Sequence, residues 1–304
     1  MPRRSPLFSL SALTQAYRRN LKAFARATKP LRAKAAAVPR ARHPAAPVAR
    51  TPRKPLPASG EWIAGIAPGP AGARRFHLYV PPALALRPGE KLPLLVMLHG
   101  CGQTGRELAA SSRMNRLAVR HRFLVLYPEQ ERLANAHGYW NWFDRRSGKA
   151  DAEAATLLAA VDLIARRHPV DTTRVAVAGL SAGASMAALL GASYPDRFCA
   201  VAMHSGVAPG SADSTTTAMA AMHGRREAHL PEPLQALAAG GSDRVPLPPL
   251  LILHGDADPV VSVRNAAATA VLWAQALAAR AGTVRTLQRG RRYASRVTEF
   301  KERG

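Results

Sequence analysis

Several features are scarce in this sequence of 304 residues. It has only two cysteines, Cys101 and Cys199, too few for a disulfide framework or a cysteine-rich metal site. It has no run of about 18 apolar residues, which excludes a membrane-spanning helix. No acidic residue precedes Glu61, and no histidine follows His254. The lack of acids before Glu61 concerns the amino-terminal segment. The lack of histidines after His254 concerns the catalytic chemistry.

Residues 1–59 form a basic segment rich in proline and alanine, and they carry much of the formal net charge of +24. Proline at this frequency removes amide donors and disfavours regular structure, so we expect a disordered tail. Within it, residues 7–27 are patterned as a basic amphipathic helix that would suit a membrane surface. Such a tail can bind polyanions weakly through its positive charge. A solvated leader is the simpler interpretation, and no motif indicates specific recognition of nucleic acid.

From residue 60 onward the sequence predicts one α/β domain with a mostly parallel, doubly wound sheet, because buried strands alternate with helices. Leu92–Leu98 is a continuous apolar run of the kind that lies in the middle of such a sheet. The expected strands are 74–80, 92–98, 123–127, 174–178, 199–204 and 250–254, and the expected helices are 106–121, 150–167 and 182–193. Residues 209–248 interrupt this alternation and are interpreted as a cap or lid.

The strongest chemical motif is Gly179-Leu180-Ser181-Ala182-Gly183, which directly follows a predicted strand and precedes a predicted helix. This is the context of a nucleophile elbow, in which a tight turn exposes the serine hydroxyl above the sheet. We therefore predict that Ser181 is the nucleophile. The alternative is a serine that merely caps a helix.

Two further loops follow predicted strands at the same edge of the sheet. His99-Gly100-Cys101 stands where such a fold places an oxyanion loop, so the backbone amides of Cys101 and Ala182 are predicted to stabilise the developing negative charge. His99 is interpreted as a structural residue of that loop. Asp258 is predicted to orient a catalytic imidazole, with Asp256 as the alternative carboxylate and turn formation as the non-catalytic interpretation of both.

These motifs, HGCGQT (99–104), YWNWF (139–143), GLSAG (179–183), HSG (204–206) and HGDADPVV (254–261), occur together in this order. In this respect the sequence from residue 60 to 304 resembles the esterase family of short-chain polyhydroxybutyrate depolymerases, relatives of feruloyl and acetylxylan esterases. The resemblance implies an α/β-hydrolase fold, hydrolysis of a polymeric or short-chain ester without a cofactor, and a substrate cleft lined by Trp140, Asn141 and Trp142. A core position is the alternative for these aromatic residues.

The resemblance also implies an extracellular protein, although Ser9, Ser11 and Thr14 interrupt the apolar stretch that a signal peptide would need. A cytoplasmic location is the alternative. Many members of the family carry cysteine at the position of Tyr139, so we expect no disulfide to Cys101.

The largest departure concerns the catalytic histidine. In this fold the triad follows the order Ser, Asp, His, yet all ten histidines precede Asp258. Relatives continue into a final strand, a loop with the histidine and a last helix, so the sequence is interpreted as truncated before them, with weak or no activity. His204 and His223 are alternative bases. A second hypothesis is a non-catalytic scaffold whose basic tail binds polyanions.

Overall fold

The computed structural model describes residues 60–82, 84, 86–131, 135, 137–229 and 246–301. The predicted tail, with its helix over residues 7–27, lies outside these residues, as do residues 230–245 of the predicted cap. None of the helices in the described ranges combines the length and the apolar character needed to cross a bilayer.

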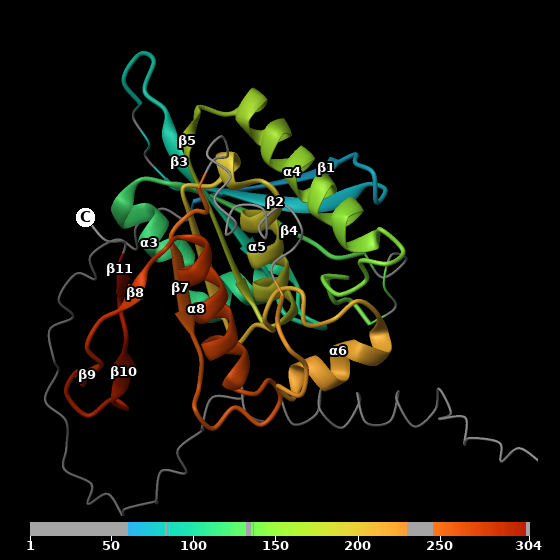
Figure 1. The fold of residues 1–304 in the computed structure, drawn as a ribbon. Coiled ribbons are helices and arrows are strands. Elements are labelled where there is room, and N and C mark those ends of the chain that lie inside the picture. Colours follow the sequence, from blue (N-terminus) through green and yellow to red (C-terminus); the bar gives the residue numbers. More distant parts are fainter. Residues whose placement is uncertain are drawn as a thin grey trace, which may run out of the picture. The chain divides into compact units, whose positions relative to one another are not determined.

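The centre of the described domain is a seven-stranded sheet in the order β1-β2-β4-β3-β5-β6-β7 (Figure 1). The strands from β4 through β3, β5 and β6 to β7 pair in parallel, whereas β1 and β2 are antiparallel to their neighbours. This confirms the predicted α/β class with a mostly parallel sheet. The strands are β1 (Glu61–Ala67), β2 (Arg74–Val80), β3 (Leu92–Leu98), β4 (Leu124–Pro128), β5 (Val170–Leu180), β6 (Ala200–His204) and β7 (Leu250–Leu253).

Helices cover both faces of this sheet. The cluster that fills one face joins α4 and α5 to the strands, and a second cluster joins α2 and α3 to the opposite face. Helix α8 packs beside α5 and β6, where Trp273 joins a cluster with Ala188 of α5 and Met203 of β6. The helices are α2 (Gly105–Ser112), α3 (Met114–His121), α4 (Lys149–Arg167), α5 (Ala182–Ser193), α6 (Thr215–Met222) and α8 (Arg264–Ala276), with a short 3₁₀ turn η1 (Pro195–Arg197).

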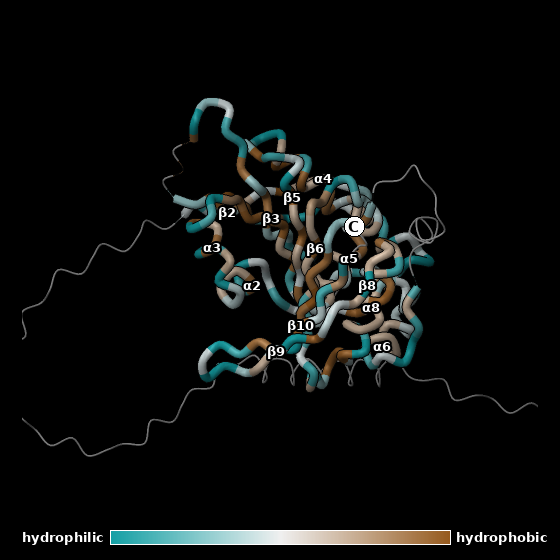
Figure 2. Tube along the Cα trace, turned by 60° about the vertical axis from the view of Figure 1, so that its left-hand side comes forward, coloured by the Kyte–Doolittle hydropathy of each residue, from teal (hydrophilic) through white to brown (hydrophobic). Residues whose placement is uncertain are grey.

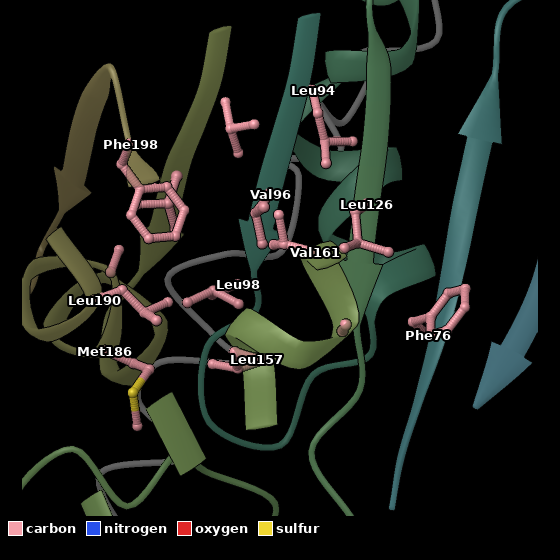
Figure 3. Close-up of a cluster of buried hydrophobic side chains, with 14 of the residues drawn as sticks. Phe76, Leu94, Val96, Leu98, Leu126, Leu157, Val161, Met186, Leu190 and Phe198 are labelled. Carbon is pink, nitrogen blue, oxygen red and sulfur yellow. The ribbon is translucent and has the colours of Figure 1, made fainter. Parts of the chain in front are cut away.

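The main core lies between the sheet and helices α4 and α5. Figure 3 shows Leu94, Val96 and Leu98 of β3 facing Leu157 and Val161 of α4 and Met186 and Leu190 of α5. All residues of α5 from Ala182 to Ala192 are buried, which is typical of a helix packed on every side. Figure 2 shows the apolar character of the central strands.

Several elements differ from the sequence prediction, which also lacked helices α6 and α8. The helix expected over residues 106–121 is two helices, because Arg113 adopts a left-handed conformation (φ 56°) and its N–H donates to Ala109 O, ending α2. Strand β1 was not predicted as a strand at all. It pairs along its whole length with β2, from Glu61 opposite Val80 to Ala67 opposite Arg74.

Beyond the sheet, residues 280–301 form a β-hairpin. Its strands are β8 (Arg280–Ala281), β9 (Arg285–Leu287), β10 (Ser295–Val297) and β11 (Phe300–Lys301). Strand β8 pairs with β11, and β9 pairs with β10. Nearly all of its residues are exposed, and it carries seven Lys and Arg residues against one acid, Glu299.

At the opposite edge from β1, β7 has β6 as its only partner strand among the described residues. Leu251 and Leu253 of β7 are 55% and 49% exposed. They pair in register with Ala202 and His204 of β6, which pair in turn with Ala178 and Leu180 of β5. Ala178 and Leu180 pack with α2 and α3, so Leu251 and Leu253 lie on the same face of the sheet as these helices. This part of that face is open in the described ranges.

Candidate active site

Ser181 stands on a sharp turn between β5 and α5. Its φ of 55° and ψ of −118° lie outside the regions that non-glycine residues ordinarily adopt, and strain of this kind is characteristic of functional turns. The Ser181 N–H donates to His204 O at 2.8 Å, which fixes the turn to the end of β6.

The two glycines of the motif are required because other backbone passes close to them. A Cβ atom on Gly179 would lie 2.1 Å from Gly183 O, and one on Gly183 would lie 2.2 Å from Leu98 O and 2.6 Å from His99 O. Ordinary side-chain carbons do not approach so closely. The helix that follows Ser181 is therefore in direct contact with the end of β3, where the predicted oxyanion loop begins.

The oxyanion loop, residues 99–104, is a closed hydrogen-bonded turn. Gly100 N–H donates to Gln103 Oε1 at 3.0 Å, and Gln103 N–H donates back to Gly100 O at 3.2 Å. Gly102 N–H donates to Gly138 O at 3.2 Å. Ala182, the second predicted donor, is the first residue of α5, where backbone N–H groups have no acceptor within the helix. The catalytic role of both amides stays a prediction.

His99 is 1% exposed and uses both ring nitrogens. Gln130 N–H donates to its Nε2 at 3.0 Å, which leaves the proton on Nδ1, and Nδ1 lies 2.8 Å from Gly100 O. Burial lowers the pKa of His99, which favours this neutral form. These bonds agree with a structural role for His99.

Asp258 is held in the loop after β7. Its Oδ1 accepts hydrogen bonds from Val260 N at 2.9 Å and from Val261 N at 3.0 Å. Its Oδ2 lies 3.7 Å from His254 Nε2, which is itself 2.8 Å from Val261 O. Asp256, the alternative carboxylate, is exposed. The catalytic role of Asp258 stays a prediction, with Asp256 as the alternative.

His204 and His223 were the alternative bases, and the structure places them differently. His204 ends β6 opposite Leu180, the residue before Ser181. Burial, followed by the nearby His254, lowers the pKa of His204, whereas Asp258 acts to raise it. His223 ends α6, where its N–H donates to Met219 O. Of the two, His204 is the one joined to the nucleophile turn.

The three predicted cleft residues separate into two groups. Trp140 is fully buried, and its indole N–H donates to His99 O at 2.9 Å. Asn141 is 7% exposed and bonded to Glu153. Trp142 is only partly buried and packs on a cluster that joins Phe143 to Val207, α6 and Val261. Trp142 therefore packs on the cluster that includes Val261 of the Asp258 loop. Trp140, in contrast, bonds directly to His99 of the oxyanion loop, and Asn141 bonds to Glu153.

Sequence reasoning missed Glu153 and Gln130. Both are buried, and Glu153 sits on the buried stripe of α4 with Ala150, Ala154, Leu157 and Val161. An acid on an apolar stripe at helical spacing is the signal that was available, because a buried carboxylate must have partners. Among the described residues, no three His, Cys, Asp or Glu side chains come together in a way that could hold a metal ion.

Several known proteins are similar to this chain in sequence. The chain is 36% identical over 176 residues to poly(3-hydroxyalkanoate) depolymerase C of Paucimonas lemoignei, covering 57% of this chain and 42% of that protein. It is 32% identical over 209 residues to a probable acetylxylan esterase A of Aspergillus clavatus, covering 66% and 65%. Feruloyl esterase B of Neurospora crassa is 30% identical over 211 residues, covering 67% and 70%. The matched part thus spans less than two thirds of the first two relatives.

Among solved structures, the acetyl xylan esterase from Aspergillus awamori superposes with a TM-score of 0.58 at 22% identity, covering 73% of this chain and 81% of that one. At this identity the likeness supports the α/β-hydrolase fold alone. The family model described as Esterase PHB depolymerase matches residues 74–291, which is well over half of the chain. All five motifs lie within this range. The chain therefore belongs to the Esterase PHB depolymerase family.

Proposed function

We propose that this chain is a serine carboxylic-ester hydrolase for short-chain polyhydroxyalkanoates or related short acyl esters, with Ser181 as its nucleophile. The observation that carries the proposal is the strained conformation of Ser181 at the start of α5, in contact through Gly183 with the oxyanion loop. The names of the relatives, a polyhydroxyalkanoate depolymerase and acetylxylan and feruloyl esterases, support an ester as substrate.

The reaction follows from this arrangement. Ser181 Oγ attacks the ester carbonyl, and the Ala182 and Cys101 amides stabilise the oxyanion. The intermediate collapses to an acyl-enzyme with loss of the alcohol, and water then releases the acid. Asp258 would orient the imidazole that accepts the serine proton.

The catalytic imidazole is the uncertain part of this mechanism, because residues 259–304 contain no histidine. Loss of one triad member leaves about 10³–10⁴-fold catalysis over water. We therefore expect slow turnover by this chain. A measurable contribution of His204 would identify it as the base that serves here.

The test is hydrolysis of p-nitrophenyl butyrate by the wild-type chain beside Ser181→Ala and His204→Ala. Ser193→Ala, at the exposed end of the same helix, is the matched control. Turnover that disappears with Ser181→Ala and survives Ser193→Ala supports the proposal. Turnover that Ser181→Ala leaves unchanged refutes it.

Polyanion binding is a second candidate function. The predicted contact through residues 1–59 lies outside the described residues, but the exposed hairpin over residues 280–301 adds a basic surface of its own. Of its seven cations, Arg285 and Lys301 contact Glu299, and the described residues place no carboxylate within ion-pair distance of the other five. Salt-sensitive binding to anionic vesicles, lost on removal of residues 1–59, would support a role for the tail. Binding indifferent to that deletion would contradict it.

The site of action is part of the same proposal. We propose that the protein acts outside the cell, because its family includes a polymer-degrading relative. The cytoplasm is the alternative. Immunodetection of the chain in culture medium and in cell lysate distinguishes the two.

A further inference from the structure

We propose that Glu153 of α4 is a positioning residue for the oxyanion loop, acting through Trp140 and Gln130. The inference rests on the proposed function, since it concerns how the oxyanion amides of that site are held. The carboxylate of Glu153 is hydrogen-bonded to Gln130 and to Asn141, and these two residues belong to the segments that contact His99.

Glu153 is 2% exposed, and both of its oxygens are occupied. Oε1 accepts from Gln130 Nε2 at 2.7 Å, from Asn141 Nδ2 at 2.8 Å and from Arg74 at 3.1 Å. Oε2 accepts from the backbone N–H of Asn141 at 2.8 Å. Arg74 is 3% exposed, so the two charges are buried together. A carboxylate so fully bonded fixes its partners in one arrangement.

One route from Glu153 to the loop passes through the backbone of Asn141. That bond fixes the residue next to Trp140, whose indole N–H donates to His99 O at 2.9 Å. The Trp140 and His99 rings also pack together, with centroids 5.1 Å apart. His99 immediately precedes Gly100 and Cys101, so this bond sets where the loop begins.

The second route passes through Gln130. Its side-chain amide donates to Glu153 Oε1 and to Tyr139 O, while its backbone N–H donates to His99 Nε2 at 3.0 Å. His99 is thus held through its carbonyl on one side and its ring on the other. Both holds lead back to the same carboxylate. Because a displacement of about 1 Å in a catalytic group can cost roughly 10²-fold in rate, the order of this network bears on the chemistry.

The four donors need an acceptor at both oxygens of residue 153. Replacing Glu153 by Gln keeps the shape but gives one oxygen and one NH₂ group. Whichever way that amide is turned, its NH₂ group faces either Asn141 N–H or the three donors on the other side. Glu153→Gln therefore loses at least one of the hydrogen bonds that connect residue 153 to His99, although the side-chain volume is unchanged.

The experiment measures binding of butylboronic acid, which forms a tetrahedral adduct with an active serine and so reports on the oxyanion amides. Glu153→Gln, Trp140→Phe, Ser181→Ala and wild type are titrated by calorimetry. Asp162→Asn is the matched control, since Asp162 lies on the same helix and forms a partly exposed ion pair with Arg197. We expect Glu153→Gln to weaken binding about tenfold or more, Trp140→Phe to weaken it less, and Asp162→Asn to leave it unchanged.

A second readout does not depend on Ser181. The indole N–H resonance of Trp140, assigned by its absence in Trp140→Phe, should shift in Glu153→Gln and not in Asp162→Asn. Boronate affinity equal to wild type in both network variants overturns the inference, even where their stability has fallen, and it leaves the proposed function standing. Boronate binding that is absent in wild type or insensitive to Ser181→Ala overturns the proposed function instead. If Glu153→Gln fails to fold, Trp140→Phe decides the matter.

Discussion

In the variant Gly183→Ala, two effects on the free energy of unfolding oppose each other: a gain in helix propensity and a steric overlap. Gly183 is in α5, where alanine is better than glycine by about 1 kcal/mol in helix propensity. The new methyl group, however, would lie 2.2 Å from Leu98 O and 2.6 Å from His99 O. Relief of the shorter contact requires a displacement of roughly 1 Å in a core packed to crystal density, and overpacking of this kind costs about 1–3 kcal/mol or more. We expect the overlap to outweigh the propensity.

The assay is urea unfolding followed by tryptophan fluorescence, with Gly255→Ala as control. A Cβ on Gly255 would have its nearest neighbour at 4.0 Å, so that variant should unfold with wild type. With the overlap at about 3 kcal/mol and the propensity gain at about 1 kcal/mol, the net loss is about 2 kcal/mol. At a slope near 3 kcal/mol/M this loss lowers the midpoint of Gly183→Ala by roughly 0.7 M. A midpoint equal to or above wild type would refute the claim that α5 and the end of β3 touch at Gly183. Ester turnover should fall in the same variant, because the contact joins the nucleophile turn to the oxyanion loop.

The remaining predictions concern the surroundings of that loop. Thr104 caps α2, accepting from Glu107 N at 3.2 Å while Glu107 accepts from Thr104 N at 2.8 Å. Thr104→Ala should therefore cost about 1 kcal/mol of unfolding free energy, and Thr104→Ser should restore most of it. Burial raises the pKa of Glu129, so the folded protein binds more protons than the unfolded one between the ordinary value and the raised one, and stability falls as pH rises through that window. Glu129→Gln should remove this contribution, which a comparison of urea midpoints from pH 4 upward for both proteins will show; parallel profiles would contradict it.

Much of the fold was predictable because its signals are local. Leu92–Leu98 is apolar throughout and is β3, and Ala182–Ser193 follows a tight turn and is α5 with the predicted bounds. Strand β1 was missed because its apolar run from Trp62 to Ala67 shows no polar–apolar alternation and contains Ala64 and Gly65, which are poor strand formers. The break at Arg113 was missed because a left-handed arginine has no signature in sequence.

The residues of the candidate site also differ in how far the sequence predicts them. Ser181, Cys101 and Asp258 belong to contiguous motifs that follow strands, so their positions at one edge of a parallel sheet could be inferred. The bonds of Glu153 join residues 23 and 79 positions away. Nothing local specifies such partners, although the acid on a buried stripe shows that partners are needed.

On its outer side β7 has no partner strand among the described residues, and a second molecule that paired there would lie close to the site. Strand β7 leads directly into the loop that carries Asp258, and its partner β6 ends at His204. Neighbouring strands in a sheet lie about 4.8 Å apart. Any strand that pairs in parallel along the open side of β7 therefore ends beside the Asp258 loop and delivers its following residues there. A specific activity that varies with protein concentration would be the sign that this edge is occupied, so turnover should be measured over a dilution series.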